Sequence, residues 1–277
     1  MLIDTHCHLD FEAFDHDRSE VLARAAAAGV GRIIAPALDL DNVGQVVALA
    51  EKHASVYAAV GVHPNSAAAW QDAWLAELRA AAAHPKVIAI GEIGLDYHRD
   101  RALPAVQRRA FEAQLALAAE LGLPVIVHNR QADEDVLGLL AASQLPGRSR
   151  AGVLHSFSSN SEVAGRGLAL GFLLGFSGPL TYKSAEALRQ VAAEAPAERI
   201  LIETDAPFLA PQSRRGQRNE PANVRFVADK LAALRGLTTD QAAGLATANA
   251  LRLFWPQEET DGAGPSVGSV HGQPIRR

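Results

Sequence analysis

The chain has 277 residues, of which 48% are hydrophobic, and its 26 basic and 31 acidic side chains give a formal net charge of −5. This is enough apolar material for a large core, and the acidic balance excludes a protein that coats nucleic acid through bulk positive charge. The single cysteine, Cys7, excludes an internal disulfide and fits a reducing compartment. Because neither a signal peptide nor a long uncharged apolar stretch is visible, we expect a cytoplasmic protein that does not enter a membrane.

Short apolar runs recur along the chain and are typical of strands buried on both faces of a parallel sheet. They cover residues 2–6, 32–38, 56–63, 87–93, 124–128, 152–157, 171–176 and 199–204. Ala-rich segments with helical spacing lie between these runs, most clearly at 19–29, 41–53 and 105–122. Eight strand–helix units in about 250 residues predict an α/β fold of the TIM (β/α)8 barrel type, with a doubly wound open sheet as the competing alternative.

The part of the chain after the eighth run is expected to complete a single domain. Segments 221–236 and 238–254 have helical patterns and are predicted to close the barrel, which places the domain at residues 1–256. Residues 257–277 are rich in Gly, Ser and Pro, and we expect a disordered tail there.

Histidines and acids gather at the predicted strand ends, where the catalytic residues of barrels lie. Five of the ten histidines occupy such ends, together with two carboxylates: His6, His8, His63, Glu92, His128, His155 and Asp205. Residues i and i+2 of a strand share a face, so the imidazoles of His6 and His8 are predicted to point into one cavity.

Six of these side chains form a candidate metal-ligand set: His6, His8, Glu92, His128, His155 and Asp205. Imidazole and carboxylate together suit Zn or Mn, and a site that bears carboxylates can also take Mg. Six ligands exceed the need of one tetrahedral ion, so we expect two divalent ions bridged by Glu92. Paired ions about 3.5–4 Å apart are an arrangement that hydrolyses phosphate esters.

Ordinary structural explanations exist for each of these residues taken alone. A single histidine is more often a surface or core residue than a ligand, and His16, His53, His84 and His98 fit that description. Asp205 could equally form the turn before Pro207, and we interpret Cys7 as a core residue. A buried Glu92 without a partner would be costly, however, and a metal ion supplies that partner.

Eight segments carry a resemblance to a known family: DTHCHLD (4–10), VGVHP (60–64), IGEIGLDY (90–97), LPVIVHNR (123–130), HSFS (155–158), LGFSG (174–178), IETDAPFLAP (202–211) and RNEP (218–221). With them the chain resembles the TatD family of metal-dependent deoxyribonucleases. The resemblance implies a TIM barrel that holds divalent metal and hydrolyses phosphodiester bonds of DNA, often from the 3′ end of single strands. It carries over the same six ligands.

In the mechanism that we expect, these residues have separate roles. Glu92 would bridge the two ions, with one pair of histidines, His6 and His8, on the first ion and another, His128 and His155, on the second. Asp205 would bind the first ion and orient or deprotonate the attacking water. His63 matches a position that contacts the scissile phosphate.

Further substrate contacts are weaker hypotheses. Arg130 follows a ligand and is the best phosphate candidate, while Arg218 lies in the loop after strand eight, where barrels often bind phosphate. Tyr97 could stack on a base. The ordinary alternatives are a solvated basic loop and a packing tyrosine. The chain departs from the family pattern at Asn65 and Ser159, which could alter substrate fit more than metal binding.

Three other functions stay open at this stage. Amidohydrolases of the wider superfamily often bridge their metals with a carboxylated lysine at the end of strand four, but Glu92 stands there. A D-aminoacyl-tRNA deacylase would use the same metal hydroxide chemistry and has the same motifs. A non-enzymatic scaffold is disfavoured because all six ligands are intact. We expect a single-stranded DNA substrate and no obligate protein partner.

Overall fold

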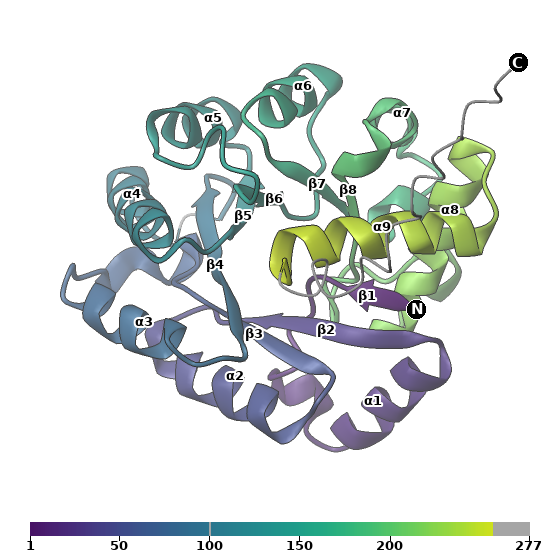
Figure 1. Cartoon of the computed structure of the whole chain (residues 1–277), viewed down its shortest axis with the longest axis horizontal. Coiled ribbons are helices and arrows are strands. Elements are labelled where there is room, and N and C mark those ends of the chain that lie inside the picture. The colour runs from purple at the N-terminus through teal and green to yellow at the C-terminus, as the bar shows by residue number, and fades with distance from the viewer. Residues whose placement is uncertain (100, 257–277) are drawn as a thin grey trace, which may run out of the picture.

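A computed structural model of the chain describes residues 1–99 and 101–256, so the expected tail at 257–277 lies outside the described residues. The strands form one parallel sheet in the order of the sequence, and helices surround it (Figure 1). The strands are β1 (Leu2–Asp4), β2 (Val30–Pro36), β3 (Val56–Val60), β4 (Val87–Asp96), β5 (Val125–Arg130), β6 (Gly152–Leu154), β7 (Leu173–Phe176) and β8 (Ile200–Ile202).

The first and last strands meet just beyond their regular ends. The amide of Asp205 donates to the carbonyl of His6 at 2.9 Å, and the amide of His8 donates to Ala206 at 2.8 Å. Cys7 and Ala206 form a parallel bridge between the same segments. Because neighbouring strands follow the sequence and the two ends join, the predicted TIM barrel is confirmed and the open sheet is wrong.

Helices follow the strands and cover the outside of the barrel (Figure 1). They are α1 (Arg18–Ala27), α2 (Leu40–Lys52), α3 (Trp74–Ala82), α4 (Pro104–Leu121), α5 (Asp133–Ala142), α6 (Ser161–Ala169), α7 (Glu186–Glu194), α8 (Val224–Arg235) and α9 (Thr239–Phe254). Short 3-10 turns lie in the loops at Glu12–Phe14, Pro64–Ala69, Gly178–Thr181, Ala197–Arg199, Gln212–Arg214 and Pro221–Asn223. None of the described helices is long and apolar enough to cross a membrane.

Local sequence signals set several helix ends. The Asp39 side chain caps α2 by accepting a hydrogen bond from the amide of Asn42, and the Asn42 side chain accepts one from the amide of Asp39. The helix therefore begins just before the expected start at residue 41. Gly122 and Gly236 end α4 and α8 with φ angles of 68° and 65°. Glycine adopts this left-handed conformation without the steric cost that a Cβ would bring.

The interior of the barrel is apolar at the beginning of the strands. Ile3, Ile34, Ile126 and Leu201 belong to one buried cluster, and the end of α9 packs into the same cluster through Phe254. Figure 1 shows α9 crossing over the strands near β1 and β8. Side chains and α9 therefore fill this end of the barrel, which confirms the predicted closing helix and leaves the opposite end for a site.

Helix α4 holds the loops of the opposite end in place. Phe111 and Leu115 are buried on its inner face, and two polar side chains, Gln107 and Gln114, are buried as well. Gln114 exchanges two hydrogen bonds with the backbone of Val62, at 2.7 and 3.1 Å. The side chain of Gln107 likewise accepts from the amide of Asp96 at 2.9 Å and donates to its carbonyl at 3.0 Å. Both pairs fix backbone beside residues of the candidate site.

Candidate active site

The first group of site residues joins the ends of three strands. His6 and His8 follow β1, and their Nε2 atoms lie 3.3 Å apart. Nε2 of His6 is 3.3 Å from Oε2 of Glu92, and Nε2 of His8 is 3.3 Å from Oδ1 of Asp205. Two imidazoles and two carboxylates thus converge on one small volume.

The second group surrounds the other oxygen of Glu92. Oε1 lies 2.9 Å from Nδ1 of His128, 3.6 Å from Nε2 of His63 and 4.0 Å from Nε2 of His155. The ring of His155 also stacks on that of His6 with centroids 3.5 Å apart. Glu92 therefore divides its two oxygens between two sets of imidazoles.

The donor set fits divalent metal. His6, His8, Glu92 and His155 are at most 6% exposed, and burying polar groups without full pairing is costly. Nδ1 of His6 and of His8 has no hydrogen-bond partner among the described residues. Within those residues, the sets His6–His8–Asp205 and His63–Glu92–His128 each place three possible ligand atoms within 4.8 Å of one another. Cations bound there would offset the buried negative charge.

Glu92 is held in its ionised form. Burial alone would raise the pKa of this carboxyl group, but the neighbouring imidazoles of His63 and His6 and the hydrogen bonds from His128 and His6 outweigh burial and hold the pKa well below its usual value. The same balance applies at Asp205, where the hydrogen bond from His8 opposes burial and lowers the pKa. Both side chains are thus anionic, as metal ligands must be.

His63 belongs to the second group, and a hydrogen bond to its ring indicates where its proton lies. Its Nδ1 accepts a hydrogen bond from the amide of Asn65 at 3.0 Å, so the proton of the neutral ring is on Nε2. Burial lowers the pKa of His63 to about 3, which keeps the ring neutral. Nε2 of His63, which carries this proton, lies 3.6 Å from Oε1 of Glu92.

Glu203 is a site residue that the sequence reasoning missed. Its side chain is fully buried, and Oε1 lies 2.8 Å from Nδ1 of His155. The same carboxylate accepts from the amide of Ser156 at 2.5 Å and from the hydroxyl of Thr5 at 3.1 Å. By holding a proton on Nδ1, Glu203 leaves Nε2 of His155 facing the site. The signal was available, because Glu203 precedes Asp205 by the same two-residue step that joins His6 to His8.

Asp96 was missed in the same way and supports His128. Oδ2 of Asp96 lies 3.2 Å from Nε2 of His128, which leaves Nδ1 facing Glu92. The other oxygen accepts from the amides of His98 and Arg99 at 3.0 and 2.9 Å. Asp96 lies four residues after Glu92 on β4, and this even spacing, which places both on one face, could have indicated it.

Comparisons with known proteins show the family of this chain. Residues 3–255 match the family model described as TatD related DNase. The chain belongs to the TatD family. It is 42% identical to the uncharacterized metal-dependent hydrolase YabD of Bacillus subtilis over 254 residues, which cover 92% of this chain and 99% of YabD. It is 38% identical to the 3′-5′ ssDNA/RNA exonuclease TatD of Cronobacter sakazakii over 260 residues, covering 91% and 97% of the two chains.

A solved structure of the TatD family is also similar. The crystal structure of YjjV, a TatD homologue from Escherichia coli, superposes with a TM-score of 0.86 at 39% sequence identity, and the match covers 91% of this chain and 97% of YjjV. Family membership makes this TatD-family chain a metal-dependent hydrolase. The likeness extends over both the barrel and the loops that carry the site.

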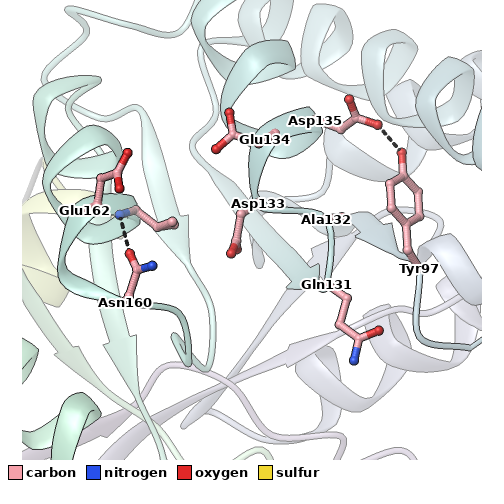
Figure 2. Close-up of a pocket in the computed structure, with 9 residues that line it drawn as sticks. Tyr97, Gln131, Ala132, Asp133, Glu134, Asp135, Asn160 and Glu162 are labelled. Atoms are coloured by element: carbon pink, nitrogen blue, oxygen red, sulfur yellow. Dashed lines mark hydrogen bonds between the residues drawn. The ribbon is translucent and has the colours of Figure 1, made fainter.

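Two of the side chains predicted to contact substrate, Tyr97 and Arg218, interact with other side chains of this TatD-family chain. The Tyr97 hydroxyl donates to Asp135 at 2.6 Å, at the edge of a cavity of about 550 Å³ (Figure 2). Acidic side chains line the cavity: Asp133, Glu134, Asp135 and Glu162. The guanidinium group of Arg218 forms an ion pair with Asp17 at 2.7 Å and lies over the Phe14 ring. Both side chains thus have structural partners, while Arg130 ends β5 with its side chain exposed.

The two departures from the TatD pattern have specific contacts. The side-chain amide of Asn65 donates to Asp96 at 3.2 Å, and the Ser159 hydroxyl donates to Asp133 at 2.6 Å. Lys86 precedes β4 and donates to the carbonyls of Ala54 and Val56 at 2.7 and 3.1 Å. It therefore lies at the beginning of the strand, away from the position that a bridging carboxylated lysine would take.

Proposed function

We propose that this protein hydrolyses phosphodiester bonds of DNA, from the 3′ ends of single strands, with two divalent ions bridged by Glu92. The observation that carries the proposal is the division of the Glu92 oxygens, with Oε2 towards His6 and Oε1 towards His128. One carboxylate that faces two imidazole sets is the arrangement that a bridged ion pair requires. The exonuclease name of a relative supports the substrate class.

The proposed ligand assignment follows the two groups. The first ion would be held by His6, His8, Glu92 and Asp205, and the second by Glu92, His128 and His155. Imidazole-rich sites favour Zn or Mn, while the two carboxylates also accept Mg. When bound, such a pair supplies activated water at neutral pH and offsets charge that builds on the phosphate.

The protein's own side chains would orient the substrate and the metal ligands and would transfer the proton of the attacking water. Asp205 is ionised and 14% exposed at its side chain, so it can accept a proton from the attacking water. The Nε2–H of His63 would donate to a phosphate oxygen, and Arg130 would add positive charge at the edge of the site. Glu203 and Asp96 would keep His155 and His128 in their orientations. We also propose a cytoplasmic location, which suits the buried free thiol of Cys7.

A panel of substrates with the metal-loaded protein tests the substrate class. We expect turnover of single-stranded DNA in the wild type, with loss of activity in Glu92→Gln and no loss in the surface control Glu120→Gln, whose side chain is 55% exposed. Hydrolysis of an aminoacyl ester or a cyclic amide with no cleavage of DNA would contradict the proposal. It would instead favour the deacylase or amidohydrolase alternatives.

A further inference from the structure

Two phenylalanine rings lie against a residue of the first ligand group and have no part in the proposed chemistry. The ring of Phe11 lies 5.0 Å from that of His8, and the ring of Phe208 lies 5.6 Å from Phe11 in an edge-to-face contact. Phe208 is also 6.1 Å from His8. We call Phe11 and Phe208 the aromatic shelf.

The shelf leaves one ring open to solvent at the site. Phe208 is 49% exposed, although most large apolar side chains of the described residues are buried. Exposing half of a phenylalanine ring forgoes a large part of its hydrophobic stabilisation. A ring so placed beside His8 is positioned to cover an apolar or planar group of a bound substrate.

The backbone holds Phe208 rigidly in this position. Its amide donates to the carbonyl of Asp205 at 2.9 Å. Its carbonyl accepts from the side chain of Asn219 at 2.7 Å, and Asn219 is 1% exposed and also bonds Thr204. The backbone of Phe208 is therefore fixed relative to Asp205, and the ring itself contacts Phe11 and His8, so binding has to restrict only the side-chain torsions of Phe208.

Charge distinguishes the shelf from the other aromatic candidate, Tyr97. Tyr97 stands beside the acidic cavity of Figure 2, where Asp133, Glu134 and Asp135 would repel a phosphate chain. The loop that follows Phe208 instead carries exposed arginines, Arg214 and Arg215. Their guanidinium groups lie over the rings of Phe226 and Tyr182. They therefore add positive charge to the loop between β8 and α8, which favours a chain of phosphates on that side of the site.

We infer that the aromatic shelf is a base-binding subsite, on which Phe208 stacks a nucleobase at the 3′ end of a single strand. The inference rests on the proposed nuclease function and adds a substrate requirement: the terminal nucleotides must carry a planar base. Stacking on an aromatic side chain tolerates every base, so the subsite would recognise single strands without reading their sequence.

The test compares oligonucleotides that end in a normal nucleotide with ones that end in an abasic residue. With the metal-loaded wild type we expect a KM about tenfold higher for the abasic end. Phe208→Ala should raise KM about tenfold on the normal end only, which removes the difference, while Phe208→Trp should keep it. Phe208→Leu retains apolar volume without a ring and should behave like the alanine variant. Leu103→Ala, at a side chain 69% exposed, is the matched control and should behave like the wild type.

A second readout does not depend on turnover. Stopped-flow fluorescence would follow an oligonucleotide with 2-aminopurine at one of its last two 3′ positions, while a 5′ dye reports binding by anisotropy. Stacking should quench the 2-aminopurine in the wild type and in Phe208→Trp but not in Phe208→Ala. Quenching that is absent in the wild type or unchanged in Phe208→Ala, with binding seen by anisotropy, would overturn the shelf and leave the nuclease proposal intact. Absence of both binding and cleavage in the wild type would overturn the proposed function, and the shelf with it.

Discussion

Replacing Glu203 by glutamine tests whether the side chains around the ligands set metal affinity. The substitution keeps the shape of a fully buried side chain, so the contacts with the amide of Ser156 and the hydroxyl of Thr5 can both be retained. What it removes is the negative charge 2.8 Å from Nδ1 of His155. That charge, together with the carboxylates of Glu92 and Asp205, raises the pKa of His155 to about 10 against the opposing effect of burial, so its loss should lower the basicity of the ring.

Loss of an outer carboxylate of this kind lowers metal affinity or activity roughly 10- to 100-fold, which corresponds to about 1.4–2.8 kcal/mol. Isothermal titration of the chelator-stripped protein with Zn or Mn would measure the change, and circular dichroism would show that the barrel stays folded. Glu120→Gln is the control, because the Glu120 side chain is 55% exposed and pairs with Arg79 on the surface. Affinity within twofold of the wild type in Glu203→Gln would refute the reasoning.

Three further substitutions follow from individual contacts. Gly175→Ala would place a Cβ 2.8 Å from both oxygens of Glu203, so we expect reduced metal affinity by titration, and unchanged affinity would show that Glu203 can move freely. His63→Ala removes one hydrogen-bond donor and should lower kcat by a factor of roughly 10²–10³ with the metal content unchanged in elemental analysis; a loss of bound metal would make His63 a ligand. Gly94 has a φ of 141°, and in Gly94→Ala the added Cβ would lie 2.0 Å from the carbonyl oxygen of His128. It should destabilise the fold by about 3 kcal/mol or more in urea unfolding, and a wild-type midpoint would contradict the described path of β4.

The fold was largely predictable from the sequence, because strands buried on both faces leave continuous apolar runs. All eight runs correspond to strands, but their ends shifted by several residues. The run at 56–63 ends as a strand at Val60, so His63 lies in the loop before a 3-10 turn. The run at 87–93 continues to Asp96, because β4 goes on pairing with β5 as far as Arg130. Such partners are distant in sequence and leave no local signal.

For the candidate site, the sequence indicated which side chains lie at its centre but not how they face one another. His6, His8, Glu92 and Asp205 could be chosen from their places at strand ends. Which Glu92 oxygen faces which histidine depends on the relative positions of four strands, and no sequence pattern shows it. The exposed ring of Phe208 was hidden for another reason, because an apolar residue in a motif is indistinguishable from a core residue until its burial is known.

The central claim is that a bridged ion pair at Glu92 cleaves DNA from a 3′ end. The most direct measurement follows the degradation of single-stranded oligonucleotides that carry a label at the 3′ or the 5′ end. The protein is first stripped of metal by a chelator and then supplied with Mg, Mn or Zn. We predict metal-dependent shortening that removes the 3′ label first, leaves a 5′-labelled ladder and disappears in Glu92→Ala. Absence of cleavage with every metal, in protein that still binds two ions, would contradict the account.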